Sequence, residues 1–403
     1  MSDPNLSTSV RLVRVFAILT VVFAALLLVV GGVVTSLRAG MADRGWPRSP
    51  TYIAEDPKVW QAGNTGLLVE HSHRALGFLT GGCASLLALA AWWTEPRRGL
   101  RWAGLAAVLA LLVVYGQFHR EMGVAWQARE QALDSGEPPG AILWPKTTGV
   151  VCGVAALAVL GVAVASFAAG GRWRWLRLLA SVGLVAVMVQ GLLGGFRVFL
   201  DQLMGTHLAA IHGAFAQLVF CVLLSVVVLS APVRPERELP AADRDRLGLL
   251  ALLLPAGVVV QLVWGVMVRH AGTPLGQRLH ILTAFVVTGI AVWLAARALA
   301  TPTGRARLGF YAYHLVAIVA VQVLLGVESW MGKFAAAGPE LAVPPMERAV
   351  TKGAAIVRTL HMLVGVALLA ASVLLAFRVW RRADVGSVVE VPPKPAPEPV
   401  AAS

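Results

Sequence analysis

The chain has unusually few charged residues. Asp, Glu, Lys and Arg make up 14% of its 403 residues and apolar residues make up 58%, with a mean hydropathy of +0.74. A soluble globular domain carries about 25% charged and about 45–50% apolar residues. The composition therefore excludes an ordinary soluble domain and indicates that lipid surrounds most of the chain.

Cysteine is also scarce. The three cysteines, Cys83, Cys152 and Cys221, all lie inside apolar runs, and none falls in a connection between runs. This placement argues against a disulfide framework and against a zinc site built from cysteines. No small-residue cleavage site follows the first apolar run, so we interpret that run as a retained helix and not as a signal peptide.

Long apolar runs dominate what is present. A membrane-spanning helix needs about 20 mostly apolar residues, and lipid favours helices because it offers no partner to backbone polar groups. The alternating pattern of a membrane barrel is absent. We expect about ten spanning helices, near residues 12–35, 67–93, 100–118, 147–169, 177–199, 206–231, 247–269, 277–299, 308–331 and 355–379.

Arginine clusters predict the orientation of these helices. The net charge is +13, and the arginines gather in short clusters on alternate connections. Membrane topology explains this excess better than a nucleic-acid partner does. With an even number of helices the clusters share one side, which the positive-inside rule assigns to the cytoplasm together with both termini. Six tryptophans near that side fit an interfacial belt: Trp92, Trp93, Trp102, Trp173, Trp175 and Trp380.

An internal repeat divides the chain. In three outward-running helices a glutamine precedes a glycine by four residues, and a helix with a histidine follows each copy: Gln190 and Gly194, Gln261 and Gly265, Gln322 and Gly326. Close helix packing through a small residue is the alternative explanation of each copy. The repeat predicts an all-α polytopic membrane protein of two parallel four-helix bundles, with a two-helix insertion near 100–169 in the first.

The expected domain boundaries follow from these runs. Residues 1–11 are a cytoplasmic N-terminus, 12–231 the N-terminal helical half, 232–246 a cytoplasmic linker and 247–382 the C-terminal helical half. Residues 383–403 are rich in proline, alanine and valine, and we expect them to form a disordered tail. The long connections at 36–66, 119–146 and 332–354 lie on the opposite, outer face.

Four of the nine histidines lie at matched depth. His73, His212, His280 and His361 are about four to six residues inside the outer ends of their expected helices, roughly 6–9 Å below the interface. Such groups are costly in lipid and usually mark function, although a lone histidine can simply bond a neighbouring helix. Haem iron accepts one or two histidines, whereas zinc favours a tighter cluster. We expect His73 to pair with His212 (or His207 in its place) and His280 with His361.

Arginines lie close to these histidines in the sequence. Arg74, Arg278 and Arg358 fall within the same turns, and Arg197 and Arg269 fall at the outer ends of neighbouring helices. Arginine binds carboxylates well, and haem carries two propionates of that kind. The alternative is that these side chains extend to the membrane interface without a ligand.

One acid breaks the symmetry between the two halves. Glu70 precedes His73 by three residues, so the two share a helix face. The matching positions are Gln277 before His280 and Arg358 before His361. A site that couples proton transfer to chemistry has a use for such an acid. The alternative is stabilisation of the helix N-terminus through the macrodipole.

Several motifs resemble the haem A synthase family. The segment EHSHRALG at 70–77 resembles its Glu-x-x-His-Arg-x-x-Gly motif, and GGVVTSLRAGMADRGWP at 31–47 is similar to the end of its first helix. QGLLGGFRV at 190–198 is similar to its Gln-Gly-x-Leu-Gly-Gly segment, and HGAFAQ at 212–217, HILTA at 280–284 and HMLVG at 361–365 are similar to its later histidine helices. The six motifs keep the family order over most of residues 12–380.

The resemblance implies an oxidoreductase that converts the C8 methyl of haem O to the formyl group of haem A. It implies that Glu70, His73 and His212 are the catalytic residues at the substrate haem. His280 and His361 would ligate a haem b cofactor, and the three arginines within the histidine turns would help to bind the cofactors. All four matched histidines would thus be ligands of haem iron.

The resemblance also implies a setting. We expect a bacterial inner membrane, an electron acceptor in that membrane, contact with lipid, and haem O synthase and a second copy of the chain as further partners; nucleic acid is not expected. Two features depart from the family: it commonly has eight helices, and some members carry outer-loop cysteine pairs that this chain lacks. Two rival functions are a di-haem b electron-transfer cytochrome and a haem transporter.

Overall fold

The computed structural model describes residues 8–40, 42–43, 45, 60, 63–136, 144–204, 206–231, 238–270, 272–335 and 351–381. Across these residues the chain forms ten α-helices and no strand. All ten are long and apolar enough to cross a membrane. The all-α polytopic fold is therefore confirmed, and the chain is a multi-pass membrane protein. The tail predicted at 383–403 lies outside the described residues.

Local sequence signals define where two of the histidine helices begin. The Thr273 side chain accepts a hydrogen bond from the Gly276 N–H, and Thr351 does the same for Ala354, as N-capping residues do. The helices are α1 (Thr8–Ser36), α3 (Thr65–Trp92), α4 (Arg98–Asp134), α5 (Lys146–Ala168), α6 (Arg174–Met204), α7 (Thr206–Ser230), α8 (Ala241–His270), α9 (Pro274–Leu299), α10 (Pro302–Ala335) and α11 (Lys352–Trp380).

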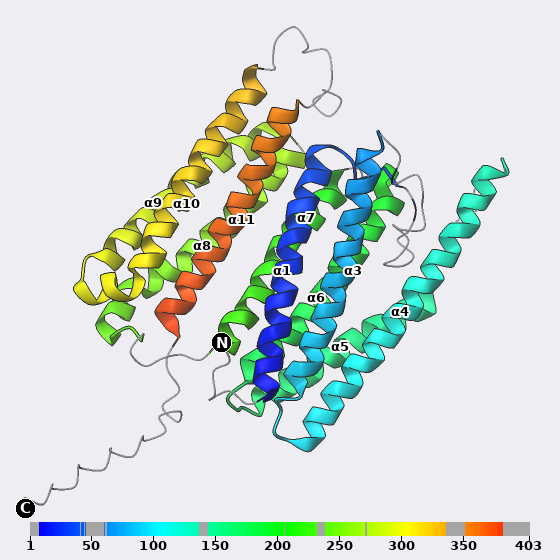
Figure 1. The fold of residues 1–403 in the computed structure, drawn as a ribbon, viewed down its shortest axis with the longest axis horizontal. Coiled ribbons are helices and arrows are strands. Elements are labelled where there is room, and N and C mark those ends of the chain that lie inside the picture. Colours follow the sequence, from blue (N-terminus) through cyan, green and yellow to red (C-terminus); the bar gives the residue numbers. More distant parts are fainter. Residues whose placement is uncertain are drawn as a thin grey trace, which may run out of the picture.

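By their contacts, eight of these helices form two rings of four, and the two groups of helices lie side by side in Figure 1. In the N-terminal ring, α1 packs on α3, α3 on α6, α6 on α7 and α7 on α1. In the C-terminal ring, α8 packs on α9, α9 on α10, α10 on α11 and α11 on α8. The rings meet where α1 and α7 contact α11 and where α7 contacts α8. The helices that carry histidines, α3 with α7 and α9 with α11, therefore stand diagonally opposite each other in their rings.

The inserted helices stand outside the N-terminal ring. Helix α4 contacts α3 and α5, and α5 contacts α6, on the side away from the C-terminal ring (Figure 1). The insertion therefore thickens one wall of the N-terminal ring without entering it.

Helix α4 is longer than the apolar run predicts. The expected span ends at 118, but α4 continues to Asp134, so the predicted outer connection at 119–146 is largely helical. Phe118, Met122 and Trp126 recur every four residues and are buried against the C-terminal half of α6. This spacing places them on one helix face. The predicted end of this helix was wrong because a search for long apolar runs stops at the polar residues that separate these three side chains.

Other helices also begin before the expected residue. Helix α8 starts at Ala241, inside the predicted 232–246 linker, and its first-turn residue Asp243 accepts a hydrogen bond of 3.0 Å from Arg246. The four histidines lie six to nine residues after the first residue of their helices. His212 and His280, at six residues, lie within the expected four to six, whereas His73 and His361, at eight and nine, lie deeper because α3 and α11 begin before the expected residues.

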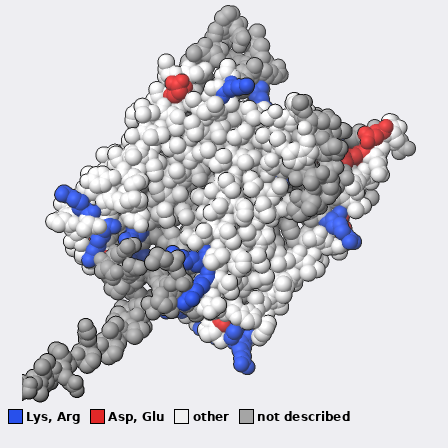
Figure 2. Space-filling model, viewed as in Figure 1, with Lys and Arg blue, Asp and Glu red and all other residues white. Residues whose placement is uncertain are grey.

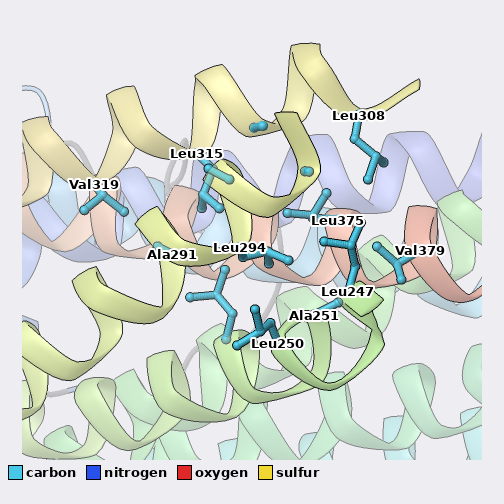
Figure 3. Packing of buried hydrophobic residues seen from close by; sticks show 14 of the residues in the cluster. Leu247, Leu250, Ala251, Ala291, Leu294, Leu308, Leu315, Val319, Leu375 and Val379 are labelled. Carbon is cyan, nitrogen blue, oxygen red and sulfur yellow. The ribbon is translucent and has the colours of Figure 1, made fainter. Parts of the chain in front are cut away.

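Apolar residues and charged residues occupy different parts of the molecule, as in other membrane proteins. Leu247, Leu294, Leu315 and Leu375 from the four helices of the C-terminal ring meet in one buried cluster (Figure 3). A broad face between the helix ends carries no Lys, Arg, Asp or Glu (Figure 2). Charged residues on this view lie near the helix ends, which fits an apolar belt in contact with lipid tails.

A buried ion pair fastens the insertion at the arginine-rich end. The Glu95 and Arg177 side chains are 0% and 1% exposed, and their charged atoms lie 2.9 Å apart. The Ser166 hydroxyl donates to Glu95 at 2.5 Å and accepts from Arg177 Nε at 2.8 Å. These three residues belong to the α3–α4 connection, the end of α5 and the start of α6. The cluster therefore fixes α5 against the N-terminal ring.

Replacing Glu95 is expected to destabilise this junction. In Glu95→Ala the Arg177 guanidinium stays buried without its carboxylate, which costs about 3–5 kcal/mol. Thermal unfolding in detergent micelles measures the loss. Arg98→Ala, at an exposed residue nearby, is the control and should change stability by less than about 0.5 kcal/mol. An unchanged midpoint in Glu95→Ala would contradict the role of the pair.

Candidate functional site

Each of the four matched histidines packs against a glycine of the preceding helix in its ring. A Cβ built on Gly31 would lie 2.8 Å from Cε1 of His73. The equivalent distances are 3.2 Å from Gly194 to His212, 3.0 Å from Gly265 to His280 and 3.1 Å from Gly326 to His361. Any larger residue would push the imidazole away, so these glycines set how closely each histidine approaches.

The residue four before each glycine contacts the same histidine. At His280, Nδ1 donates to the Gln261 carbonyl at 3.2 Å, and the Gln261 side-chain amide donates to the His280 carbonyl at 2.8 Å. The Gln190 amide likewise donates to the His212 carbonyl at 2.9 Å and lies 3.1 Å from Nδ1. The Leu27, Gln190 and Gln322 carbonyls face His73, His212 and His361.

The fourth copy of this pattern is invisible to the sequence repeat. Leu27 and Gly31 of α1 occupy the places of Gln261 and Gly265. The Gln-x-x-x-Gly search misses them because a leucine replaces the glutamine. The structure thus contains four glycine–histidine contacts where the repeat indicated three, and all eight ring helices take part.

The histidines meet in pairs across the rings. The His73 and His212 ring centres are 6.4 Å apart with planes at 73°, and those of His280 and His361 are 6.2 Å apart at 81°. Two imidazoles that bind one metal ion from opposite sides, each at about 2 Å, have centres about 6 Å apart. Metal-binding histidines also donate their other ring N–H to a carbonyl, as His280 does to Gln261. Both pairs therefore fit haem iron, which accepts two axial histidines.

A polar network adjoins the N-terminal pair. Arg74 donates to Glu70 Oε1 and to Asp43 Oδ2, each at 2.8 Å. The Asp43 N–H donates to Glu70 Oε2 at 2.8 Å, and His71 Nε2 lies 2.9 Å from Asp43 Oδ2. The side chains of Glu70 and His71 are 5% and 1% exposed. Both oxygens of the Glu70 carboxylate are thus fixed by hydrogen bonds.

The position of Glu70 in its helix excludes one explanation of this residue, namely stabilisation of the helix N-terminus. No acid lies in the first turn of α3, because Glu70 comes five residues after Thr65. Macrodipole stabilisation acts within the first turn, so it does not explain this residue. Glu70 instead belongs to a defined cluster beside His73.

The arginines expected to bind propionates differ in their surroundings. The Arg74 guanidinium faces Glu70 and Asp43, whereas Arg278 is exposed and Arg358 is half-buried. Arg269 donates to the Ser36 hydroxyl at 3.0 Å and to the Gly32 carbonyl at 3.3 Å, so it links α8 to α1. Binding of propionates by these side chains stays a prediction.

The geometry favours His212 over His207 as the partner of His73. His207 is exposed, whereas His212 lies against Gly194 and faces His73. His119, on the inserted helix α4, stands apart from both pairs and packs on Phe78, with ring centres 5.7 Å apart. Haem ligation by His73, His212, His280 and His361 remains a prediction that their geometry fits.

Sequence reasoning missed two members of the polar network. Asp43 and His71 were not expected at the site, although Asp43 lies in a segment that matches a family motif and His71 adjoins Glu70. A link between them was not readable, because Asp43 follows α1 and only the packing of α1 on α3 brings it to His71. Trp46 and Pro47 of the same motif lie outside the described residues.

Comparison with known proteins supports the N-terminal part of this assignment. The family model described as cytochrome oxidase assembly protein matches residues 2–120, which include α1, α3 and the polar network. The resemblance to the haem A synthase family is thereby confirmed over this part of the chain. No curated protein and no solved structure matches the chain.

Replacing Asp43 is expected to loosen the network. Asp43→Ala removes the acceptor of His71 Nε2 and one of the two acceptors of Arg74 Nη1, which also donates to the Gly45 carbonyl. Hydrogen bonds to charged groups contribute about 1.5–3 kcal/mol. We expect a stability loss of about 2 kcal/mol, measured by thermal unfolding in detergent. Asp134→Ala, at an exposed residue at the end of α4, should leave the midpoint unchanged. Equal effects of the two variants would show that the network does not support the fold.

Proposed function

Because residues 2–120 match the cytochrome oxidase assembly proteins, we propose that the chain is a haem A synthase. This family supports a role in cytochrome oxidase assembly. The proposed reaction is the oxidation of the C8 methyl of haem O to the formyl group of haem A within the membrane.

The observation that carries the proposal is a difference between two otherwise equivalent sites. Both rings hold a histidine pair at nearly the same separation, 6.4 Å and 6.2 Å. Glu70 lies three residues before His73, whereas Gln277 and Arg358 hold the matching positions before His280 and His361. Two identical electron carriers have no use for this difference. A substrate site beside a cofactor site has one.

The C-terminal ring is the proposed cofactor site. His280 and His361 would hold a haem b, which supplies one-electron transfer when bound. Gln261 fixes the His280 ring, and the Thr283 hydroxyl donates to the Gln261 side-chain oxygen, so this ligand has a second layer of support. Such outer partners orient metal-binding histidines. The electron acceptor is a membrane component.

The N-terminal ring is the proposed reaction site. His73 and His212 would orient the substrate haem between α3 and α7. Arg74 and the Asp43 N–H hold the Glu70 carboxylate one helix turn from His73. From there Glu70 can accept a proton at Oε1 or Oε2, or stabilise positive charge that develops on the substrate.

The role of Glu70 is testable by product analysis. Cells supplied with haem O and expressing the wild-type chain are expected to accumulate haem A, measured by haem extraction and chromatography. In Glu70→Ala we expect haem A to fall by at least about 100-fold, as on loss of an acid–base catalyst, while haem b stays bound to the purified protein.

A matched acid elsewhere controls this experiment. Glu328 is an exposed residue of α10, and Glu328→Ala should leave haem A production unchanged. Haem b without haem A in the wild type would refute the synthase and favour an electron-transfer cytochrome. A wild-type protein purified without any haem would favour a transporter.

The glycine contacts provide a separate test of the cofactor site. Valine at Gly265 would place its Cβ 3.0 Å from Cε1 of His280 and its methyl groups closer still. We expect Gly265→Val to reduce haem b affinity by roughly tenfold, as displaced outer-shell partners do. The haem b content per purified protein measures this. Gly289→Val, on α9 with open space at Cβ, is the control; equal haem b loss in both would contradict the proposed packing.

A further inference from the structure

Arg74, the arginine next to His73 in the sequence, is already bonded at both terminal nitrogens. Its Nη1 donates to Asp43 Oδ2 at 2.8 Å and to the Gly45 carbonyl at 2.9 Å. Its Nη2 donates to the Asp43 carbonyl at 2.6 Å and to Glu70 Oε1 at 2.8 Å. Each terminal nitrogen carries two hydrogens, so these four bonds use all of them. Arg74 therefore holds Glu70 and keeps no terminal N–H for a carboxylate of a bound haem.

Arg197 of α6 is a second cation beside the same histidine pair. Its positive charge lies close enough to interact with the rings of both His73 and His212, and the residue is half-buried. A haem carries two propionates, and a carboxylate that leaves water is costly unless a cation pairs with it. Because Arg74 is committed to its network, Arg197 is the residue placed to supply that cation.

A glycine lets the Arg197 guanidinium pack against the backbone that follows α1. A Cβ built on Gly40 would lie 2.6 Å from Nη1, 2.8 Å from Nη2 and 2.9 Å from Cζ, so the flat face of the guanidinium covers this glycine. The N–H groups lie in the plane of the guanidinium and therefore point sideways from this contact. Gly40 lies three residues before Asp43, and Arg197 lies three residues after Gly194. The charge is thus at the end of the ring that holds the polar network, about 4.5 Å along α6 from the glycine that packs on His212.

This arginine is not part of the scaffold that the two rings share. The residue three after each of the other histidine-packing glycines carries no charge: Val34 after Gly31, Val268 after Gly265 and Ser329 after Gly326. Packing of a histidine on a glycine therefore does not require a cation at this position. A role in the N-terminal ring alone explains the arginine better.

We propose that Arg197, and not Arg74, binds a propionate of the substrate haem. This inference rests on the proposed function and deepens it, because it gives the two arginines separate tasks. Arg74 fixes the acid, and Arg197 pairs with a carboxylate through its N–H groups. Two axial histidines leave a haem free to rotate about the line that joins them. Because the C8 methyl and one propionate share a pyrrole ring, a bound propionate would also fix which methyl group is presented for oxidation.

A haem without charged propionates tests the proposal. The protein is purified with haem b from cells that lack haem O and is titrated with haem O and with haem O dimethyl ester, and absorption spectra give the two dissociation constants. In the wild type we expect haem O to bind at least about tenfold more tightly than the ester, the effect of one hydrogen bond to a charged group. Arg197→Gln should bind haem O as weakly as the ester. The change in this ratio isolates the pair of charges.

Gly40→Ala separates the position of the charge from its presence. This variant keeps Arg197, but the added Cβ displaces the guanidinium, so the preference for haem O over the ester should fall as in Arg197→Gln. Two controls should keep the wild-type preference: Gly153→Ala, on α5 with open space at Cβ, and Arg120→Gln, at an exposed arginine of α4. Haem b retained in the C-terminal ring shows that each variant is folded.

Arg74→Gln decides between the two arginines. We expect this variant to keep the preference for haem O over the ester and to lose haem A production, because Glu70 is no longer held. A preference that survives in Arg197→Gln would overturn the inference, and its loss in Arg74→Gln would then assign the carboxylate to that arginine. Equal binding of haem O and the ester by the wild type would also overturn it. A wild type that binds neither would instead refute the proposed substrate site and with it the proposed function.

Discussion

Close contact between an imidazole and a glycine of the neighbouring helix is the constraint on which both sites depend. In lipid, helices associate through packing and interhelical hydrogen bonds because apolar burial offers little advantage there. A glycine lets the backbone approach, and at Gly31, Gly194, Gly265 and Gly326 the space gained is filled by a histidine ring. The same contact that joins two helices therefore also fixes the depth and direction of a ligand.

Helix α1 makes the two rings depend on each other. Adjacent glycines on it face different rings: Gly31 packs on His73, and Gly32 packs on Met362, next to His361. At the same level Arg269 of α8 donates to Ser36, and Ser36 bonds Thr359 of α11 at 2.7 Å. One helix thus forms part of the wall of both sites, so that a shift of α1 would alter both histidine pairs.

The two halves share a scaffold and differ in chemistry. In the C-terminal ring a glutamine lies four residues before each glycine that packs on a histidine. In the N-terminal ring a leucine holds this position for His73, and the network of Glu70, Asp43 and Arg74 lies beside that histidine. Duplication of a four-helix unit explains the shared part. The differences concentrate on α1 and α3, and both helices lie within the family match, which also covers α4 as far as residue 120. The inserted helices pack against the outside of this ring, and α3 and α7 remain diagonally opposite each other within it.

The sequence by itself determined the number of helices, their approximate spans and the matched positions of the four histidines, because these follow from apolar length and spacing along one chain. It also indicated that Glu70 has no counterpart in the second half. It did not predict the extension of α4 to Asp134, because Phe118, Met122 and Trp126 are buried only by their packing on α6. Tertiary structure alone decided that Asp43 and His71 join Glu70, that His212 rather than His207 faces His73, and that Leu27 completes the fourth copy of the repeat. Each of these depends on which helix faces which across a ring, and the spacing of residues within one helix carries no information about its neighbour.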